Sequence, residues 1–226
     1  MEENVMRCVR VWFEKKGDVR FISHLDLMRT MTRVIRRSKI PLWYTEGFNP
    51  HPYMTFVLPL SLGMESENDA MDIRVEGDIT NEDVRKALSS SMPAGVTVTG
   101  VTDPVLDPKF ISFARFQMVF YVSENASEIE ERIRTLLSGE SLVVQKLGKK
   151  GHKKVYKDID LLPHVKSYEI AVKGGVPVLS LILPAGSTTN INPALLADKI
   201  LEGLDGDDYC VIGRKRLYDE EMNDFS

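Results

Sequence analysis

Two histidines near the start of the chain are the side chains best suited to catalysis. His51 lies between two prolines in the segment 47–52, which we expect to be an exposed loop, and His24 lies in the first turn of an expected helix. A histidine beside arginines can act as a general acid or base near neutral pH. His24 and His51 are therefore the candidate catalytic residues. His24 also shares the helical angle of Met28, which favours packing near the sheet, and the spacing assigns His51 no third, orienting group.

Arginines follow one face of the helix expected after Ser23. Ser23 followed by Asp26 is a capping signal, because the hydroxyl and the carboxylate occupy backbone amides of the first turn. Pro41 then ends the helix, since its ring excludes helical geometry at the preceding residue. Asp26 is the only acid inside the helix, so the positive face is a candidate anion-binding surface rather than a plain solvated face. The apolar face comprises Leu27, Met28, Met31, Val34 and Ile35, and the opposite face, called the arginine stripe below, comprises Arg29, Arg33, Arg36 and Arg37.

A second basic segment spans residues 146–157, where lysines and glycines predict a polybasic loop. Such loops bind phosphate groups electrostatically, with an affinity that falls steeply as the salt concentration rises. The alternative is an ordinary solvated surface. If the two halves of the chain pack by pseudo-symmetry, this loop, the loop at 47–52 and the arginine stripe border one cleft. The candidate ligand-binding residues are Arg20, Arg29, Arg33, Arg36, Arg37, Asn49, His51, Lys149, Lys150, His152, Lys153, Lys154 and Lys157.

The pattern of apolar and polar residues predicts the same order of elements twice. The four strands of each unit are expected at 5–13, 53–60, 70–76 and 96–101 in the first half, and at 113–122, 168–172, 178–183 and 209–217 in the second. Additional short strands are expected at 40–45 and, after the first helix of the second half, at 141–147. With a pair of helices in each half, this predicts an α+β fold of two tandem ferredoxin-like (β-α-β-β-α-β) units with antiparallel sheets. The domains are expected at 1–103 and 110–226, joined by a linker at 104–109, with the lysine-rich insertion 146–157 in the second.

The composition argues against several classes of protein. A formal net charge of −4 over 226 residues argues against coating nucleic acid by charge alone, so a polyanion site must be local. Two distant cysteines form neither a disulfide framework nor a metal set, and no P-loop, dinucleotide or zinc spacing occurs. No apolar run reaches the roughly 18 residues that span a bilayer. We therefore expect a cytoplasmic protein with no metal, no cofactor and no membrane contact.

Three motifs give the chain a resemblance to a known family. They are F-x-K-x-G-x-x-R-F-I-S-H-L-D-L at 13–27, P-L-x-Y-x-x-G-F-N-P-H-P at 41–52 and L-P-L-S-L-G-M-E-S at 58–66. Together they resemble the bacterial radical-SAM-associated domain of unknown function, which is found fused to radical SAM proteins or encoded separately. The resemblance implies a radical SAM protein as partner. The chain itself contains no C-x3-C-x2-C motif, so it cannot hold the iron–sulfur cluster of such an enzyme.

Two functions from different classes follow from these observations. The first is a non-catalytic recognition module that binds RNA or another phosphate-bearing substrate for a radical SAM partner. The second is a metal-independent endoribonuclease, which would resemble CRISPR repeat-processing enzymes in layout but not in sequence motif. A protein-interaction scaffold is a third, weaker hypothesis. Trp12 shares a strand face with Arg10, where it either stacks on RNA bases, as in RNA-binding ferredoxin-like sheets, or packs beneath the second domain.

Overall fold

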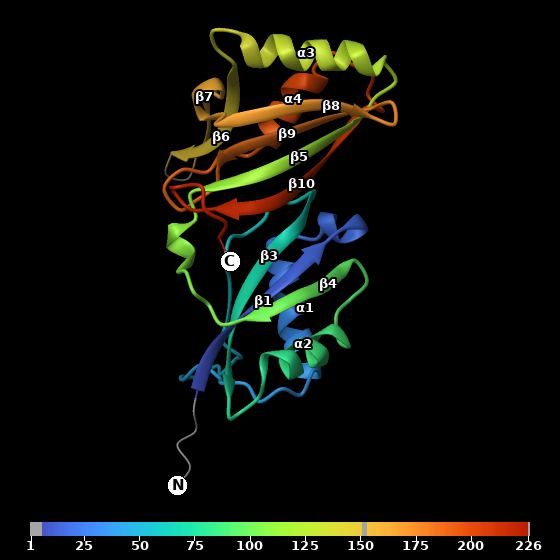
Figure 1. The fold of residues 1–226 in the computed structure, drawn as a ribbon. Helices are drawn as coiled ribbons and strands as arrows, with labels where there is room; N and C mark the ends of the chain where they lie inside the picture. Colours follow the sequence, from blue (N-terminus) through green and yellow to red (C-terminus); the bar gives the residue numbers. More distant parts are fainter. Residues whose placement is uncertain (1–5, 151–152, 226) are drawn as a thin grey trace. The chain divides into compact units, whose positions relative to one another are not determined.

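The computed structural model describes residues 6–150 and 153–225 (Figure 1). It confirms a mixed α+β fold. The described residues contain four α-helices, and each strand pair described below is antiparallel. Contacts divide the chain into two compact units: unit 1 contains the described residues up to Phe110 together with Phe225, and unit 2 contains Ile111–Asp224. None of the helices in these ranges is long and apolar enough to cross a membrane.

Unit 1 contains four strands and two helices. In chain order they are β1 (Met6–Lys15), α1 (His24–Arg37), β2 (Met54–Phe56), β3 (Met64–Glu76), α2 (Asn81–Ser89) and β4 (Val96–Thr102), with the 3-10 helix η1 (Gly17–Phe21) before α1. The strands are ordered β4-β1-β3-β2, and each neighbouring pair is antiparallel. Figure 1 shows α1 and α2 on one side of this sheet. The core of unit 1 therefore lies between the two helices and one face of the sheet.

The alternation in β1 and the periodicity of α1 produce this core. Val9, Val11 and Phe13 point to one face of β1 and are fully buried. On α1, the Ser23 hydroxyl accepts a hydrogen bond from the backbone N–H of Asp26, as the capping signal predicts. The buried residues of α1 are Leu27, Met31, Val34 and Ile35, which confirms the predicted apolar face, with Met28 half-buried at its edge.

The predicted strands between α1 and α2 differ from the observed ones. The expected strand at 40–45 is wrong, because only isolated bridges occur there, from Leu42 to Val75 and from Tyr44 to Pro52. The expected strand at 53–60 contracts to β2, since prolines 52 and 59 on either side of it have no N–H to donate to a ladder. By contrast, β3 begins at Met64, six residues before the predicted start.

Unit 2 repeats the element order with a hairpin added. Its elements are β5 (Phe113–Tyr121), α3 (Ala126–Ser138), β6 (Val143–Lys150), β7 (Lys153–Asp160), β8 (Ser167–Lys173), β9 (Val176–Pro184), α4 (Ala194–Leu201) and β10 (Tyr209–Tyr218). Four of these strands form an antiparallel sheet in the order β10-β5-β9-β8. The remaining two, β6 and β7, pair with each other in a separate two-stranded sheet.

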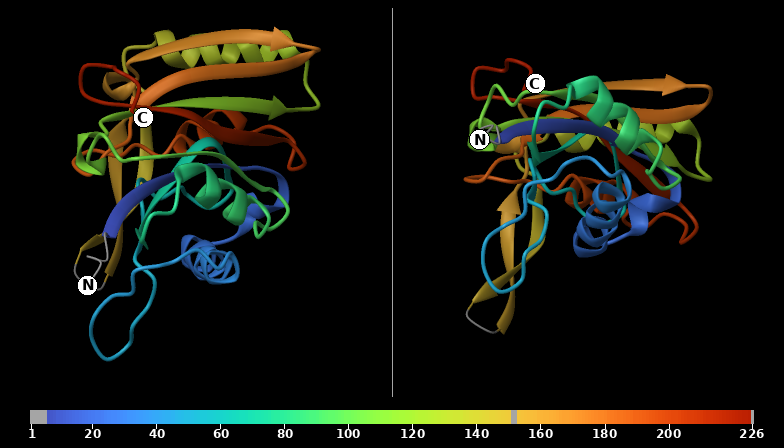
Figure 2. Two further views of the ribbon diagram at one scale, coloured as in Figure 1. Left: turned by 60° about the horizontal axis from the view of Figure 1, so that its bottom comes forward. Right: turned by 90° about the horizontal axis from the view of Figure 1, so that it is seen from below.

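The prediction that residues 146–157 form a loop is therefore wrong. Most of it belongs to the β6–β7 hairpin, visible in Figure 1 and Figure 2. Valines at 143, 144 and 155 and Tyr156 favour extended backbone, and the lysines continue the same two strands. Residues 151–152, including His152, lie outside the described residues.

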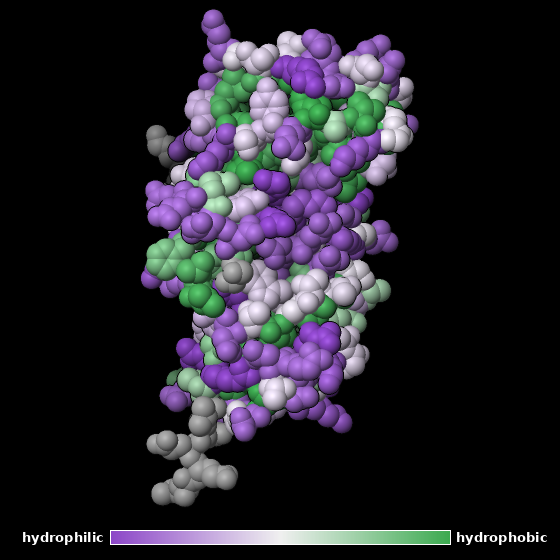
Figure 3. All heavy atoms as spheres, viewed as in Figure 1, coloured by the Kyte–Doolittle hydropathy of each residue, from purple (hydrophilic) through white to green (hydrophobic). Residues whose placement is uncertain are grey.

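The segment between β4 and β5 exposes apolar side chains. It contains a short 3-10 helix, η2 (Pro108–Phe110). Val105 is 82% exposed and Phe110 is 51% exposed. Figure 3 shows the corresponding apolar patch over this segment.

Candidate nucleic-acid interface

The arginine stripe lies on the solvent side of α1, and its members differ in the partners of their guanidinium groups. All four arginines are exposed. Arg29 pairs with Asp26 at 3.0 Å, and the pKa of Asp26 is lowered by the hydrogen bond from the Ser23 hydroxyl and by Arg29. Arg37 Nη2 donates to the carbonyl oxygen of Ser91 at 2.9 Å.

Arg33 and Arg36 are the members of the stripe whose guanidinium groups make neither a hydrogen bond nor an ion pair among the described residues. Within residues 6–150 and 153–225, neither guanidinium lies within ion-pair distance of a carboxylate. They are three positions apart on α1, so they are neighbours on the same helix face. Both charges are therefore available to an external anion.

A projecting loop follows α1 and is called the finger loop here (residues 44–52). The helix ends at Arg37, and the chain turns through Lys39, which has a φ of 57°. At the base of the loop Tyr44 bridges to Pro52. Figure 2 shows the loop, in light blue, extending away from the strands of unit 1.

Hydrogen bonds brace the finger loop from side to side. The Thr45 N–H donates to the His51 carbonyl oxygen at 2.9 Å, and the His51 N–H donates to Thr45 Oγ1 at 3.2 Å. Gly47, at the turn, has a φ of +123°, a conformation that other residues rarely adopt. The prolines at 50 and 52 fix further backbone angles. The loop is thus internally ordered by its own bonds.

The orientation of the His51 ring follows from the same bracing. Its Nδ1 lies 3.0 Å from the carbonyl oxygen of Asn49 and 3.1 Å from Thr45 Oγ1. A protonated Nδ1 donates to the Asn49 carbonyl oxygen, which can only accept, whereas an unprotonated Nδ1 accepts from the Thr45 hydroxyl. In the first tautomer Nε2 is the basic nitrogen, and the residue is exposed. Both contacts hold the His51 ring in one orientation.

Phe48 stands at the tip of the finger loop and is 105% exposed. Its neighbours Gly47, Asn49 and Pro50 are also exposed. Phe48 is not among the site residues that the sequence predicts. The available signal was an aromatic residue placed between a glycine and an Asn-Pro pair, since such turn residues are typical of loop tips.

An arginine side chain lies against two aromatic rings at the base of the finger loop. The Arg74 guanidinium lies 5.0 Å from the Trp43 ring centre and 4.2 Å from that of Tyr53. Both distances are within the range of cation–π attraction. The backbone N–H of Trp43 also donates to the Arg74 carbonyl oxygen at 3.1 Å. These contacts, which the sequence did not predict, anchor the finger loop to β3.

Two other predicted site residues make contacts inside unit 1. The His24 ring packs edge-on against Phe56 at 5.1 Å between ring centres, and His24 is half-buried. Arg20 pairs with Glu65 at 3.2 Å, and the same carboxylate accepts the Gly17 N–H at 2.9 Å. These contacts favour a structural role for both, while their predicted roles in catalysis and binding stay predictions.

The predicted lysines lie in unit 2, on the hairpin. In the backbone register Lys149 is opposite Lys154 and Lys150 is opposite Lys153. Lys157 is exposed. That the lysines and the arginine stripe border one cleft stays a prediction.

Trp12 is not available for stacking on RNA bases. It is only 9% exposed, and its indole N–H donates to Thr102 Oγ1 at 3.0 Å. The ring meets Phe225 edge-on at 6.3 Å. Beside it, Arg10 is fully buried and binds Asp72 through two hydrogen bonds of 2.8 and 3.0 Å. The stacking hypothesis for Trp12 is therefore wrong, because this face of β1 is covered.

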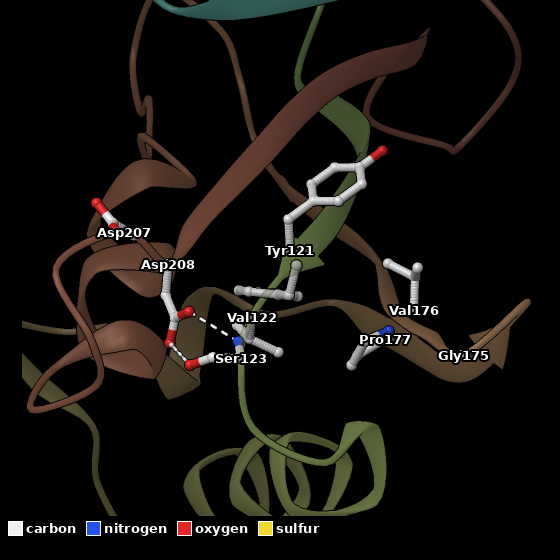
Figure 4. A pocket seen from close by; sticks show the side chains of 9 residues that line it. Tyr121, Val122, Ser123, Gly175, Val176, Pro177, Asp207 and Asp208 are labelled. Carbon is white, nitrogen blue, oxygen red and sulfur yellow. Dashed lines mark hydrogen bonds between the residues drawn. The ribbon is translucent and has the colours of Figure 1, made fainter.

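Unit 2 contains a shallow hollow of about 320 Å³, shown in Figure 4. Its polar groups largely satisfy one another, since the Ser123 N–H donates to the Asp208 carboxylate at 2.8 Å. Tyr121 on its rim stacks with Tyr209, with ring centres 5.0 Å apart. In the part of the chain that the structure describes, no group of three or more His, Cys, Asp or Glu side chains could hold a metal ion. The hollow thus lacks an obvious catalytic constellation.

A protein-family model matches most of the chain. The family described as "Uncharacterized protein conserved in bacteria (DUF2344)" matches residues 8–193. No curated protein matches the chain. The family description states no activity, so a function has to be argued from the site.

Proposed function

We propose that this chain, which belongs to the bacterial family of uncharacterised conserved proteins DUF2344, is a recognition module that binds RNA without cleaving it. The single observation that carries the proposal is the pair of exposed, unneutralised arginines, Arg33 and Arg36, on a helix that leads directly into the braced finger loop. Arginine is the side chain best suited to phosphate, because its planar fork donates two parallel hydrogen bonds.

The spacing of the arginines suits a polyanion better than a single phosphate. An α-helix rises about 1.5 Å per residue, so the stripe from Arg29 to Arg37 covers roughly 12 Å of helix length. Over such a length a nucleic-acid backbone offers several phosphates, whereas a small phosphorylated molecule offers one or two. The overall charge of −4 then keeps binding local to the stripe. The polybasic hairpin of unit 2 is the proposed second contact.

The strand orders support a ferredoxin-like assignment for both units. Numbered within each unit, both sheets run 4-1-3-2 with antiparallel neighbours. The order of elements in unit 1 is β-α-β-β-α-β, and unit 2 differs by the inserted hairpin. We therefore assign two tandem ferredoxin-like domains. Folds of this topology serve many functions, so the assignment is compatible with RNA binding but does not argue for it.

A radical SAM enzyme is the proposed recipient of the bound RNA. This part of the proposal rests on the three sequence motifs that resemble radical-SAM-linked proteins, and not on the geometry. Purification of the protein under native conditions should recover a protein with a C-x3-C-x2-C motif in stoichiometric amount. Recovery of the chain without such a protein, under conditions that preserve other complexes, would contradict this part alone.

Direct binding tests the main proposal. A fluorescent RNA hairpin with an unpaired loop is titrated with the protein at low salt, and its length is checked on a denaturing gel afterwards. We expect saturable binding, displacement by unlabelled RNA but not by an equal concentration of mononucleotide, and RNA of unchanged length. Displacement by the mononucleotide alone would indicate a small phosphorylated ligand, and the absence of any binding would refute the proposal.

Metal-independent RNA cleavage is the second candidate function, and His51 is the observation that favours it. The Nδ1 contacts to Asn49 and Thr45 orient the exposed ring, and in the tautomer with the proton on Nδ1 the nitrogen Nε2 is a base. The test is incubation of the same RNA with excess protein in EDTA. Cleavage that is lost in His51→Ala while binding stays would establish the enzyme, whereas intact RNA after prolonged incubation would support the recognition module.

A further inference from the structure

We infer that Phe48 stacks on an unpaired base, so that the RNA bound by this chain is one with a bulge, a loop or a single strand and not a continuous duplex. The inference rests on the proposed RNA binding and adds its substrate class. It names Phe48 as the residue that distinguishes unpaired from paired RNA.

The exposure of Phe48 has no explanation inside the folded chain. At 105% it is the most exposed large hydrophobic side chain among the described residues. Single exposed apolar side chains are common on protein surfaces, so exposure alone identifies no site. Phe48 differs from such a residue because its loop is closed by two hydrogen bonds between Thr45 and His51, which lie three residues before and after it.

This rigidity lowers the cost of binding. A ring on a flexible loop loses conformational freedom when it is immobilised against a ligand, whereas a ring on a braced turn has already lost much of it. The finger loop is also anchored at its base, where Arg74 lies between Trp43 and Tyr53. Phe48 is therefore presented in an ordered position before the ligand arrives.

The surroundings of Phe48 match a nucleobase. Asn49 is exposed beside it and its side-chain amide can both donate and accept hydrogen bonds, as the edge of a base requires. Only six residues, 38–43, separate Arg37, the last arginine of α1, from the bridge between Tyr44 and Pro52 at the base of the loop. Arginine contacts to phosphate position the RNA but do not read it, whereas unpaired bases expose the ring faces that aromatic side chains stack on.

Fluorescence of 2-aminopurine tests the stacking directly. Two RNAs of the same length are compared, a continuous duplex and the same duplex with one bulged 2-aminopurine. Wild-type protein should quench the bulged base and bind the bulged RNA more tightly. Phe48→Ala should abolish the additional quenching and weaken binding of the bulged RNA by roughly 5- to 150-fold, the range of base–aromatic stacking, while leaving duplex binding unchanged.

Three further variants make the outcome specific. Phe48→Trp should restore quenching, whereas Phe48→Leu should not, since leucine is apolar but has no aromatic face. Phe110→Ala, at another exposed phenylalanine of unit 1 (51% exposed), is the matched control and should bind as the wild type does. Circular dichroism should show the same fold and melting temperature for Phe48→Ala as for the wild type.

Two results would overturn the inference, and they are distinguishable. If Phe48→Ala binds and quenches bulged RNA as the wild type does, while substitution of Arg33 and Arg36 still weakens binding, the stacking role is refuted and RNA binding stands. Phe48 would then be assigned to contact with another protein. If the wild-type protein binds neither RNA at low salt, the proposed function itself fails and the inference fails with it.

Discussion

Substitution of Arg33 and Arg36 by glutamine should reduce the salt dependence of RNA binding by a predictable amount. Each phosphate contact contributes a slope of about 0.7 to 0.9 in log affinity against log salt. If both arginines contact phosphates, the double variant should lose a slope of about 1.4 to 1.8. Between about 50 and 200 mM salt, wild-type affinity should therefore fall roughly 7- to 12-fold more than that of the variant.

Fluorescence anisotropy at four salt concentrations measures this slope. Glutamine has nearly the helix propensity of arginine, and both positions are exposed, so the fold should be unaffected. The matched control is Arg85→Gln with Arg134→Gln, which removes the same two charges. Those arginines already pair with Glu82 and Glu130 at 2.8 and 2.6 Å. The control should retain the wild-type slope, and equal slopes for wild type and Arg33→Gln/Arg36→Gln would refute the reasoning.

Three further predictions concern the scaffold. Gly95→Ala should destabilise the protein by at least about 1 kcal/mol, since its φ is +81° and an added Cβ would lie 2.7 Å from the Lys16 carbonyl oxygen; Gly77→Ala, where nothing lies within 4 Å, should cost less in the same urea titration. Met31→Ala should cost about 2–5 kcal/mol, because Met31 is fully buried under the sheet, and a loss below 1 kcal/mol would contradict the packing. Burial raises the pKa of the Cys210 thiol to about 12, so Cys210 should react with iodoacetamide at pH 8 only after unfolding. Rapid labelling of Cys210 itself in the native protein would be inconsistent with this.

The capped helix α1 could be predicted from the sequence because its signals are local. Ser23 and Asp26 are three positions apart, and the periodicity of the apolar residues alone fixes which face is buried. The same periodicity predicts the arginine stripe on the outside. The sequence does not reveal the partner of each arginine, since Arg37 donates to the carbonyl oxygen of Ser91, which is distant in the chain.

The finger loop and the hairpin mark where local reasoning failed. The glycine and prolines at 47–52 correctly predict a turn. The hydrogen bonds between Thr45 and His51, and the contacts of Arg74 with Trp43 and Tyr53, depend on residues that meet only in the folded chain. At 146–157 the lysines suggested a solvated loop, although strand pairing needs only backbone groups and tolerates exposed charged side chains. For Trp12, alternation placed the ring on the correct face but could not show that the face is covered.

The most direct test of the RNA-binding surface is photo-crosslinking of the bound RNA followed by mass spectrometry of tryptic peptides. RNA that contains 4-thiouridine at its unpaired position is irradiated in complex with the wild-type protein. We expect crosslinks in the peptide 40–74, which begins after Lys39 and contains the finger loop, with Phe48 as the principal site. Crosslinks confined to peptides outside residues 29–74, at the same yield, would contradict it.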